Sequence, residues 1–285
     1  MIGFLNVYKP SGVTSNYVVQ KIKKKFNIKK IGHMGTLDPI ACGILPIAIG
    51  KATRLFDYSL EKTKKYDVIF DFGYTTDTLD VSGKIINSNG YIPTIQDIND
   101  NIHSMIGKIS QLPPLFSSKN VNGHRAYELA RLGVDFELTP KEIEIFDFRL
   151  IRQVDTNRFE FSVTCSSGTY IRSIGRDFAK ILGTFACMSY LERCENGPFG
   201  IDSSIKLDNL LELDNINDIL ISPLKIFPNF DIININNEEL NKLKNGLIVP
   251  NYQIKNNTFV LFNNQLIGVV KKEKNFLKLD TYLGD

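Results

Sequence analysis

The chain has 285 residues, of which 43% are hydrophobic and 23% charged, and its formal net charge at pH 7 is +3. This length suits one large domain or a large and a small one, because domains average about 150 residues. The sequence pI near 8.5 excludes a strongly basic protein that binds nucleic acid through overall charge, so any such contact must be local. The basic residues do cluster, at residues 21–30, 62–65 and 271–274.

The cysteines and the apolar runs indicate the compartment. Cys42, Cys165, Cys187 and Cys194 show no CxxC spacing, and the chain has only three histidines. This pattern disfavours a zinc site and predicts small buried hydrophobic residues in a reducing compartment. The amino terminus lacks a signal-peptide pattern, and no apolar run approaches the roughly 18 residues of a membrane span. We therefore expect a cytoplasmic protein with no membrane contact.

The amino-terminal segment predicts a strand, a turn and a helix. Residues 3–8 alternate weakly and end at the turn of residues 9–12, KPSG. Thr14 or Ser15 then caps a helix whose apolar positions recur at helical spacing. Its lysines fall largely on the opposite face, where they could be solvated or could contact phosphates.

A polar turn at residues 32–43, GHMGTLDPIACG, precedes an apolar run at residues 44–49. It combines one acid, one histidine and three glycines ahead of a segment that is expected to be buried. Pro39 disfavours the α conformation at Asp38, so this carboxylate is expected on a rigid loop. On this segment alone, the preferred interpretation is the commonest one, a turn carboxylate that accepts backbone N–H bonds.

The next strand is expected at residues 66–72, where Tyr66 and every second residue after it share one face. By pattern alone Tyr66 is more often a core residue than a catalyst, although an aromatic at the leading end of a strand can border a cleft. In the polar loop of residues 73–83, Asp80 could orient other site groups or form an Asx turn.

The middle of the chain predicts two helices separated by a loop. Residues 94–106 indicate a helix that is capped by its first residue and whose apolar stripe runs from Ile95 to Ile106. A loop rich in Pro, Ser and Asn at residues 111–123 leads to a short helix at residues 126–132. Long loops with exposed basic and aromatic groups are where binding concentrates.

A half-buried strand at residues 159–165 breaks at residues 166–168, and Thr169 is predicted to cap the next helix. Arg172 then falls in the first turn of this helix, where a cation opposes the macrodipole at a cost of up to about 1 kcal/mol. An anionic partner nearby is therefore the preferred interpretation, over a surface arginine that tolerates the cost.

The tail differs in composition from the rest. After Gly200 the chain is rich in Asp, Asn, Leu and Ile, and a boundary is expected near residues 222–229. Strands at residues 258–262 and 266–270 predict a hairpin, and residues 276–279 predict another short strand. The tail is therefore expected to be a small β module with a basic edge.

Seven short segments follow one another in a characteristic order. They are residues 9–15 (KPSGVTS), 32–45 (GHMGTLDPIACGIL), 50–54 (GKATR), 65–66 (KY), 76–80 (TDTLD), 111–114 (QLPP) and 166–173 (SSGTYIRS). Together they resemble the bacterial-type tRNA pseudouridine synthase B (TruB) family, in its order and at comparable separations, over roughly the first 200 residues. One such segment would be weak evidence, whereas this many in order are specific.

The resemblance implies an α+β fold: a pseudouridine-synthase catalytic domain around a central mixed, mostly antiparallel sheet. This domain is expected at residues 1–225, with an RNA-clamping loop at about residues 111–135. A small β-rich PUA-like module is expected at residues 226–285. The implied reaction is the isomerisation of uridine 55 in the tRNA T loop to pseudouridine, without a cofactor or a metal ion.

The same resemblance assigns roles in the reaction. Asp38 would act as the nucleophile, either by adding to an electrophilic carbon or by helping a glycal to form, and both routes remain open. Arg172 would keep Asp38 ionised and aimed. Tyr66 would pack on the target base and take up its C5 proton, and Tyr170 and Leu191 match pocket-lining positions.

Base flipping must precede this chemistry, because the uridine is stacked inside the T arm, and flipping costs a few kcal/mol. His33 matches the family residue that inserts into the RNA and fills the vacated space. Asp80 and Lys119 are candidate supporting residues, and the lysine clusters would contact phosphates. Asn120 stands where the family usually has its loop lysine, and Glu192 where an arginine is common. These two departures predict an active enzyme with weaker RNA affinity.

Two other classes of function fit parts of the pattern. A non-catalytic RNA-binding or RNA-folding protein could use the same lysines and His33, and a hydrolase could use Asp38 on a small substrate. Asp38, Tyr66 and Arg172 together argue against a pure binder, and no second carboxylate or histidine is obviously paired with Asp38 as two-residue hydrolase schemes require. The expected partner is the T arm of tRNA, with the protein a monomer that needs no obligate protein partner.

Overall fold

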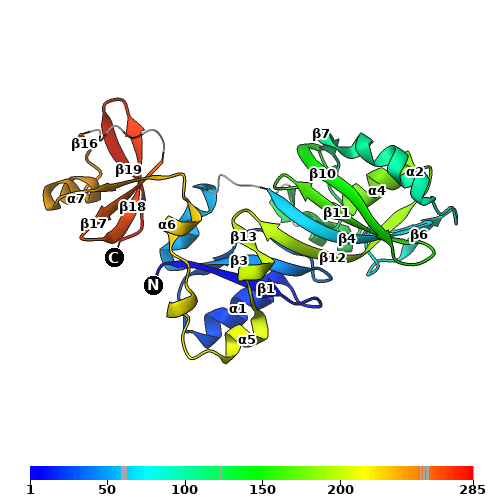
Figure 1. Cartoon of the computed structure of the whole chain (residues 1–285), viewed down its shortest axis with the longest axis horizontal. Helices are drawn as coiled ribbons and strands as arrows, with labels where there is room; N and C mark the ends of the chain where they lie inside the picture. The colour runs from blue at the N-terminus through cyan, green and yellow to red at the C-terminus, as the bar shows by residue number, and fades with distance from the viewer. Residues whose placement is uncertain are drawn as a thin grey trace.

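A large mixed sheet is the main structural element of the molecule (Figure 1). The computed structural model describes residues 1–58, 63–117, 119–121, 123–250, 252, 254 and 257–284. Ten strands of this described part form the sheet: β1 (Gly3–Lys9), β2 (Ile31–His33), β3 (Cys42–Ile49), β4 (Lys64–Phe72), β7 (Gly107–Gln111), β10 (Lys141–Gln153), β11 (Arg158–Cys165), β12 (Ala186–Asn196), β13 (Phe199–Gly200) and β14 (Ile205–Lys206).

The strand order of the main path is β14-β1-β3-β12-β4-β11-β10-β7, with β2 beside β3 and β13 beside β12. The β1–β14 and β12–β3 pairs are parallel. The other pairs are antiparallel. The expected mixed, mostly antiparallel sheet of an α+β fold is therefore confirmed.

Helices pack on this sheet through their apolar faces. Helix α1 (Ser15–Lys25) buries Val18, Val19 and Ile22, and Thr14 caps it by accepting from the Tyr17 N–H. The other helices are α2 (Ile95–Asn101), α3 (Ala126–Arg131), α4 (Ile171–Ile181), α5 (Leu207–Glu212), α6 (Pro223–Ile226) and α7 (Asn237–Lys244), with 3₁₀ helices η1 (Gly50–Tyr58), η2 (Ile102–Met105), η3 (Ile201–Ser203) and η4 (Asn217–Ile219). Within the described ranges, no helix is both long enough and apolar enough to span a membrane.

The helix predicted at residues 94–106 is shorter than expected. It ends at Asn101 and continues as η2, and its intended stripe residues Ile95 and Ile106 are 46% and 41% exposed. The Asn101 side chain donates to the Asp97 carbonyl at 2.8 Å. Asp and Asn favour such local bonds over a continued helix, which is the physical reason for the early end.

The segment of residues 111–123 is more regular than a loop. Its last residues include β8 (Asn120–Val121), which pairs with β9 (His124–Arg125) in a hairpin that leads into α3. A second hairpin, of β5 (Tyr74–Thr76) and β6 (Ile85–Ser88), follows β4. Ser118 and Asn122, which fall within the expected clamping loop, lie outside the described residues.

The tail forms a second sheet, whose strands appear in orange and red in Figure 1. Among the described residues, five strands follow the order β15-β17-β18-β19-β16. They are β15 (Asp231–Asn234), β16 (Val249–Pro250), β17 (Thr258–Phe262), β18 (Gln265–Glu273) and β19 (Phe276–Tyr282). The predicted hairpin is β17–β18, so the β-rich character of the tail is confirmed.

An aromatic cluster joins the two sheets. Phe227 and Phe230 contact Phe259 of β17, and Phe227 also contacts Phe4 of β1. Phe4 and Phe259 are fully buried. The tail module and the large sheet therefore share one hydrophobic cluster.

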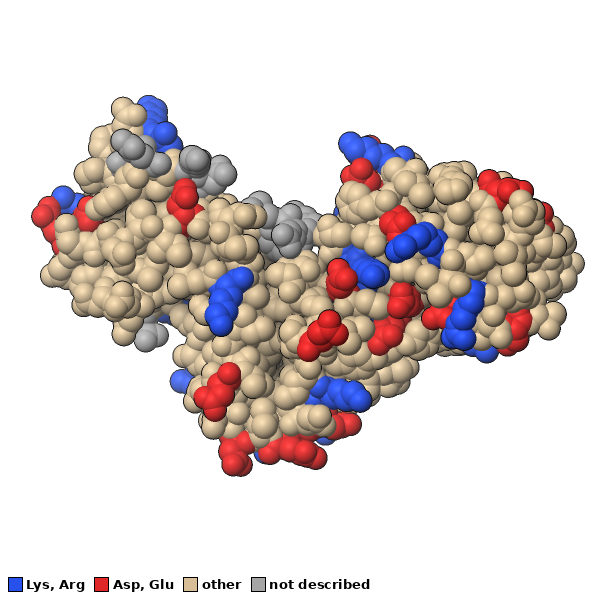
Figure 2. All heavy atoms as spheres, in the orientation of Figure 1, with Lys and Arg blue, Asp and Glu red and all other residues tan. Residues whose placement is uncertain are grey.

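Charged side chains are interspersed rather than segregated on the face shown in Figure 2. The lysines of residues 21–30 are exposed, as are those of residues 271–274. In the third cluster, Lys62 lies outside the described residues, while Lys64 and Lys65 are only half-exposed. Among the described lysines of these clusters, Lys64 and Lys65 are thus the ones that are partly buried.

Candidate active site

A cavity of about 1020 Å³ opens between the loop that carries Asp38, strands β4 and β12, and the start of α4. All the predicted site residues except Lys119 line it: His33, Asp38, Tyr66, Asp80, Tyr170, Arg172 and Leu191. The Lys119 ammonium instead donates to the carbonyl and the hydroxyl of Thr139, at 2.9 and 3.1 Å.

Arg172 is the centre of an ion-pair network in this cavity. Its Nε lies 2.9 Å from Asp38 Oδ2, and its Nη1 lies 3.6 Å from Asp80 Oδ2. The guanidinium also donates to the carbonyls of Thr78 and Phe116, at 2.8 and 3.0 Å. The side chain of Arg172 is 7% exposed and that of Asp38 is 35% exposed. A substrate can therefore reach the carboxylate, while the guanidinium is buried and held by its hydrogen bonds. The predicted anionic partner of Arg172 is confirmed.

The loop around Asp38 is fixed by the turn and helix that precede it. Ser15 Oγ accepts from the Leu37 N–H at 2.9 Å and donates to the Leu37 carbonyl at 3.0 Å. The Gly12 N–H donates to the Pro39 carbonyl at 2.8 Å. Backbone groups on both sides of Asp38 are thus held, which makes the loop rigid as predicted.

Lys9 is fully buried beneath the same loop. Its ammonium donates to the carbonyls of Val13 and Pro10 at 2.7 and 2.9 Å and lies 3.5 Å from that of Pro39. We expect Lys9→Met to lower the free energy of unfolding by about 2 kcal/mol, because buried carbonyls lose a charged donor. Urea denaturation measures this. Lys21→Met, on the exposed face of α1, serves as the control and is expected to change stability by less than about 0.5 kcal/mol.

The start of α4 is held differently from the prediction. Thr169 does not cap the helix, because its hydroxyl donates to the Ser166 carbonyl at 2.8 Å. Tyr170 is the N-cap residue and lacks a side-chain cap. Gln111 of β7 instead holds the N-cap residue itself, since its amide accepts from the Tyr170 N–H at 2.8 Å and donates to the Tyr170 carbonyl at 3.1 Å. A contact between distant segments thus fixes the backbone at the start of this helix.

His33 and Tyr66 face the cavity as uncharged rings. Burial, with the nearby charge of Arg193, lowers the pKa of His33, which favours the neutral imidazole. His33 Nδ1 is buried, with no hydrogen-bond partner among the described residues. Burial raises the pKa of Tyr66 to about 12, against the opposing effect of Arg193. Both rings therefore suit stacking in the resting enzyme.

Arg193 is a site residue that the sequence pattern did not indicate. It is fully buried, and its guanidinium donates to the carbonyls of Ile44 and Gly35 at 2.7 and 3.0 Å. Through its bond to Gly35 it holds the loop that carries Asp38, and it places a positive charge near Tyr66. The available signal was strand alternation, because Arg193 lies two residues beyond Leu191 and shares its face.

Glu192, which the sequence placed near the site, lies on the opposite face of β12 for the same reason. Its carboxylate accepts from the hydroxyls of Tyr8 and Tyr190, at 2.5 and 3.1 Å. Asn120 likewise has a local role, since its side chain accepts from the Gly123 N–H at 2.8 Å. Neither departure from the family pattern lines the cavity.

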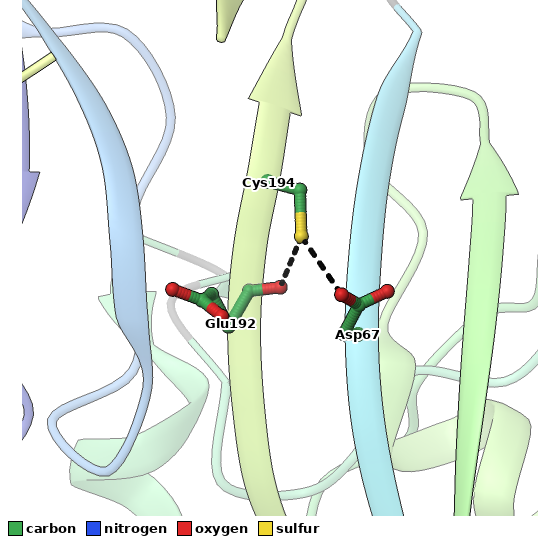
Figure 3. A group of neighbouring side chains, drawn as sticks. All are labelled: Asp67, Glu192 and Cys194. Atoms are coloured by element: carbon green, nitrogen blue, oxygen red, sulfur yellow. Dashed lines mark hydrogen bonds between the residues drawn. The ribbon is translucent and has the colours of Figure 1, made fainter. Parts of the chain in front are cut away.

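Asp67, Glu192 and Cys194 meet on that opposite face (Figure 3). The Cys194 thiol donates to Asp67 Oδ2 at 3.3 Å, and burial together with Asp67 raises its pKa to about 12. A protonated thiol that donates to a carboxylate is a hydrogen-bonding group, whereas a metal ligand must be a thiolate. Cys42, Cys165 and Cys187 are buried free thiols, as predicted.

The segment of the expected clamping loop closes one side of the cavity. The residues of this segment that line the cavity are Phe116, Ser117, Arg125, Tyr127 and Arg131. Two arginines and two aromatic rings beside an opening of this size provide the cationic and stacking groups that single-stranded nucleic acids use.

Comparisons with known proteins agree on one family. The sequence matches the model of the TruB family pseudouridylate synthase (N terminal domain) over residues 23–171. It is 40% identical over 291 residues to the tRNA pseudouridine synthase B of Clostridium novyi, covering 99% of this chain and 100% of that protein. It is 38% identical over 279 residues to that of Caldanaerobacter subterraneus subsp. tengcongensis, covering 95% and 96%.

Solved structures show the same fold. A chain in the crystal structure of a Cbf5–Nop10–Gar1 complex has a TM-score of 0.71 at 24% identity, covering 99% of this chain and 84% of that chain. A chain in an H/ACA RNP bound to a substrate RNA containing 2′-deoxyuridine has a TM-score of 0.70 at 22% identity, covering 99% and 85%. These likenesses concern the fold, whereas the sequence matches extend over the cavity residues. The chain belongs to the TruB family of pseudouridylate synthases.

Proposed function

We propose that this pseudouridine synthase isomerises uridine 55 in the T loop of tRNA, with Asp38 as the nucleophile. The observation that carries the proposal is the 2.9 Å contact between Asp38 and Arg172 inside a cavity large enough for a nucleotide. The names of the relatives support tRNA as the substrate.

The chemistry requires no redox step. The bond from C1′ to N1 breaks, the base turns, a bond from C1′ to C5 forms, and the C5 proton is lost while N1 gains one. Asp38 can add to C1′ or can help a glycal to form, and in both routes its carboxylate must be ionised. Arg172 stabilises that carboxylate by a charge-assisted hydrogen bond and fixes its direction. Asp80 holds the second side of Arg172.

His33 fills the space that the flipped base leaves in the RNA. A neutral planar ring on β2, at the edge of the cavity, can stack between bases without the cost of burying a charge. Tyr170 and Leu191 form the walls that hold the extruded base.

Tyr66 packs on the base and takes up the C5 proton. Because its pKa is about 12, the hydroxyl is protonated at rest. It can therefore take up the C5 proton only after giving its own proton to N1, and the charge of Arg193 favours the phenolate between these two transfers. We expect Tyr66→Phe to slow turnover about 100-fold with tRNA affinity within about twofold, since the ring remains and only proton transfer is lost. Single-turnover tritium release and filter binding measure the two effects. A Tyr66→Phe enzyme with wild-type turnover would remove the proton-transfer role.

The T arm is the partner, bound by a single protein chain. Thr14, Ser15 and Asn16 at the start of α1 line the cavity, and the exposed lysines of residues 21–30 extend from there. These lysines can contact phosphates that flank the extruded base, so affinity should fall as salt rises. Lys119 was expected to support the site, but its ammonium bonds to Thr139 and it does not line the cavity.

The proposal is tested by transcripts that differ at one base. An unmodified tRNA transcript labelled with tritium at uridine C5 is expected to release label from the T-loop position. The same transcript with cytidine at position 55 is expected to release none. Equal release from both transcripts would assign the reaction to another uridine.

A further inference from the structure

Lys64 is a cation in the cavity wall that the mechanism above does not use. It is the first residue of β4 and lines the cavity together with Tyr66. Residues two apart on a strand share one face, and they lie about 6.6 Å apart along it. Lys64 therefore stands beside the ring on which the base packs, on the same side of the sheet.

No carboxylate of the described residues pairs with Lys64. In the part of the chain that the structure describes, no ion pair or hydrogen bond joins its ammonium to another residue. Burial lowers its pKa to about 8, and the positive charges of Arg193 and Lys141 act in the same direction. The remaining titratable neighbour, Cys165, is a neutral thiol, because burial raises its pKa to about 11.

The carboxylates that line the cavity pair with Arg172 and not with Lys64. Asp38 and Asp80 both pair with Arg172. Arg193 is bound to backbone carbonyls, so its charge also remains uncompensated. Like charges thus gather around Lys64, which lines the cavity, and an anion bound there would relieve this unfavourable arrangement.

A glycine lies next to the ammonium group of Lys64, and another lies next to that of Lys141. A Cβ on Gly35 would lie 3.2 Å from Lys64 Nζ, and one on Gly168 would lie 2.5 Å from Lys141 Nζ. Both glycines have positive φ, +92° and +88°. Side chains at these positions would crowd the two ammonium groups, so glycine keeps this end of the cavity open.

We propose that Lys64, assisted by Lys141, binds a phosphodiester adjacent to the flipped nucleotide. The inference rests on the proposed function and names the anionic group that the site accepts. Uracil is neutral, so the phosphodiester is the group in RNA whose charge matches this end of the cavity. The contact fixes the sugar relative to Asp38, so Lys64 acts as a positioning residue.

A double-mutant cycle between protein and substrate tests the contact. Wild type and Lys64→Met are compared on transcripts with a natural linkage or a neutral methylphosphonate on the 5′ or the 3′ side of the target uridine. We expect Lys64→Met to lower kcat/KM about 10-fold on natural RNA and to reduce the slope of log affinity against log salt by about 1. At one of the two linkages, the methylphosphonate should lower wild-type kcat/KM similarly and add nothing in the variant.

Lys108→Met is the matched control. Lys108 lies on β7, its ammonium is 3.8 Å from Glu142, and it does not line the cavity. We expect its kcat/KM within about twofold of wild type. Multiplicative losses at both linkages, or an equal loss in Lys108→Met, would overturn the inference.

A failure of the proposed function can be told apart from a failure of the phosphate contact. If wild type releases no tritium from any transcript, the isomerisation is wrong, and the same cycle run on binding affinity still decides whether Lys64 contacts a phosphate. If Lys64→Met does not fold, Lys64→Gln takes its place in the cycle.

Discussion

Asp38→Asn is expected to lower turnover on the order of 10³-fold or more while tRNA affinity stays within about twofold. The amide has the size of the carboxylate and can remain near Arg172, but it cannot act as the nucleophile or carry the negative charge that the reaction needs. Single-turnover tritium release measures the rate, and filter binding measures the affinity.

Asp67→Asn provides a matched control for this loss. Asp67 lies next to Tyr66 on β4, but its side chain is on the opposite face, where it accepts from the Cys194 thiol. We expect its turnover within about threefold of wild type. If Asp38→Asn kept more than a tenth of wild-type turnover, Asp38 could not be the nucleophile.

Arg172→Met should damage both folding and catalysis. It leaves Asp80, whose side chain is 7% exposed, and Asp38 without their partner. Breaking a buried pair from one side costs about 3 to 5 kcal/mol. We expect a loss of about 3 kcal/mol in the free energy of unfolding and a fall in turnover on the order of 100-fold. Urea denaturation and tritium release check the two values.

Arg172→Lys separates charge from geometry. Lysine keeps the positive charge but cannot reach two carboxylates and two carbonyls with one fork-shaped group. We expect a smaller stability loss than in Arg172→Met and still a clear loss of turnover. Arg176→Met, one turn later in α4, removes a half-exposed pair with Asp177 and should cost less than about 1 kcal/mol. Equal behaviour of the Arg172 and Arg176 variants would contradict a special role for Arg172.

Periodic patterns predicted the elements that position the site. The alternation from Tyr66 correctly assigned the buried face of β4, and Thr14 caps α1 as expected. The unfavourable place of Arg172 at a helix start correctly indicated an anionic partner. The identity of that partner came from the family resemblance, because contact between Asp38 and a residue so distant in sequence is not encoded in local spacing.

The errors have two causes, which are contacts between distant segments and local side-chain bonds. Gln111, from a distant segment, binds the backbone of Tyr170, which takes the place of Thr169 as the N-cap, whereas Asn101 ends the second helix early through a local bond to Asp97. Arg193 was missed because a cation within a strand reads as an outward-facing residue, and Lys64 was predicted only as a member of the basic cluster that precedes the strand starting at Tyr66. The fold turns both inward, where they meet the cavity and the loop that carries Asp38.

The most direct test of the central claim is the tritium count released by wild-type protein from an unmodified tRNA transcript labelled at uridine C5. At saturating enzyme, the proposed isomerisation predicts release that reaches the equivalent of one uridine per tRNA. A transcript that is bound with salt-dependent affinity but releases no label would contradict catalysis by Asp38 and leave the protein as an RNA binder.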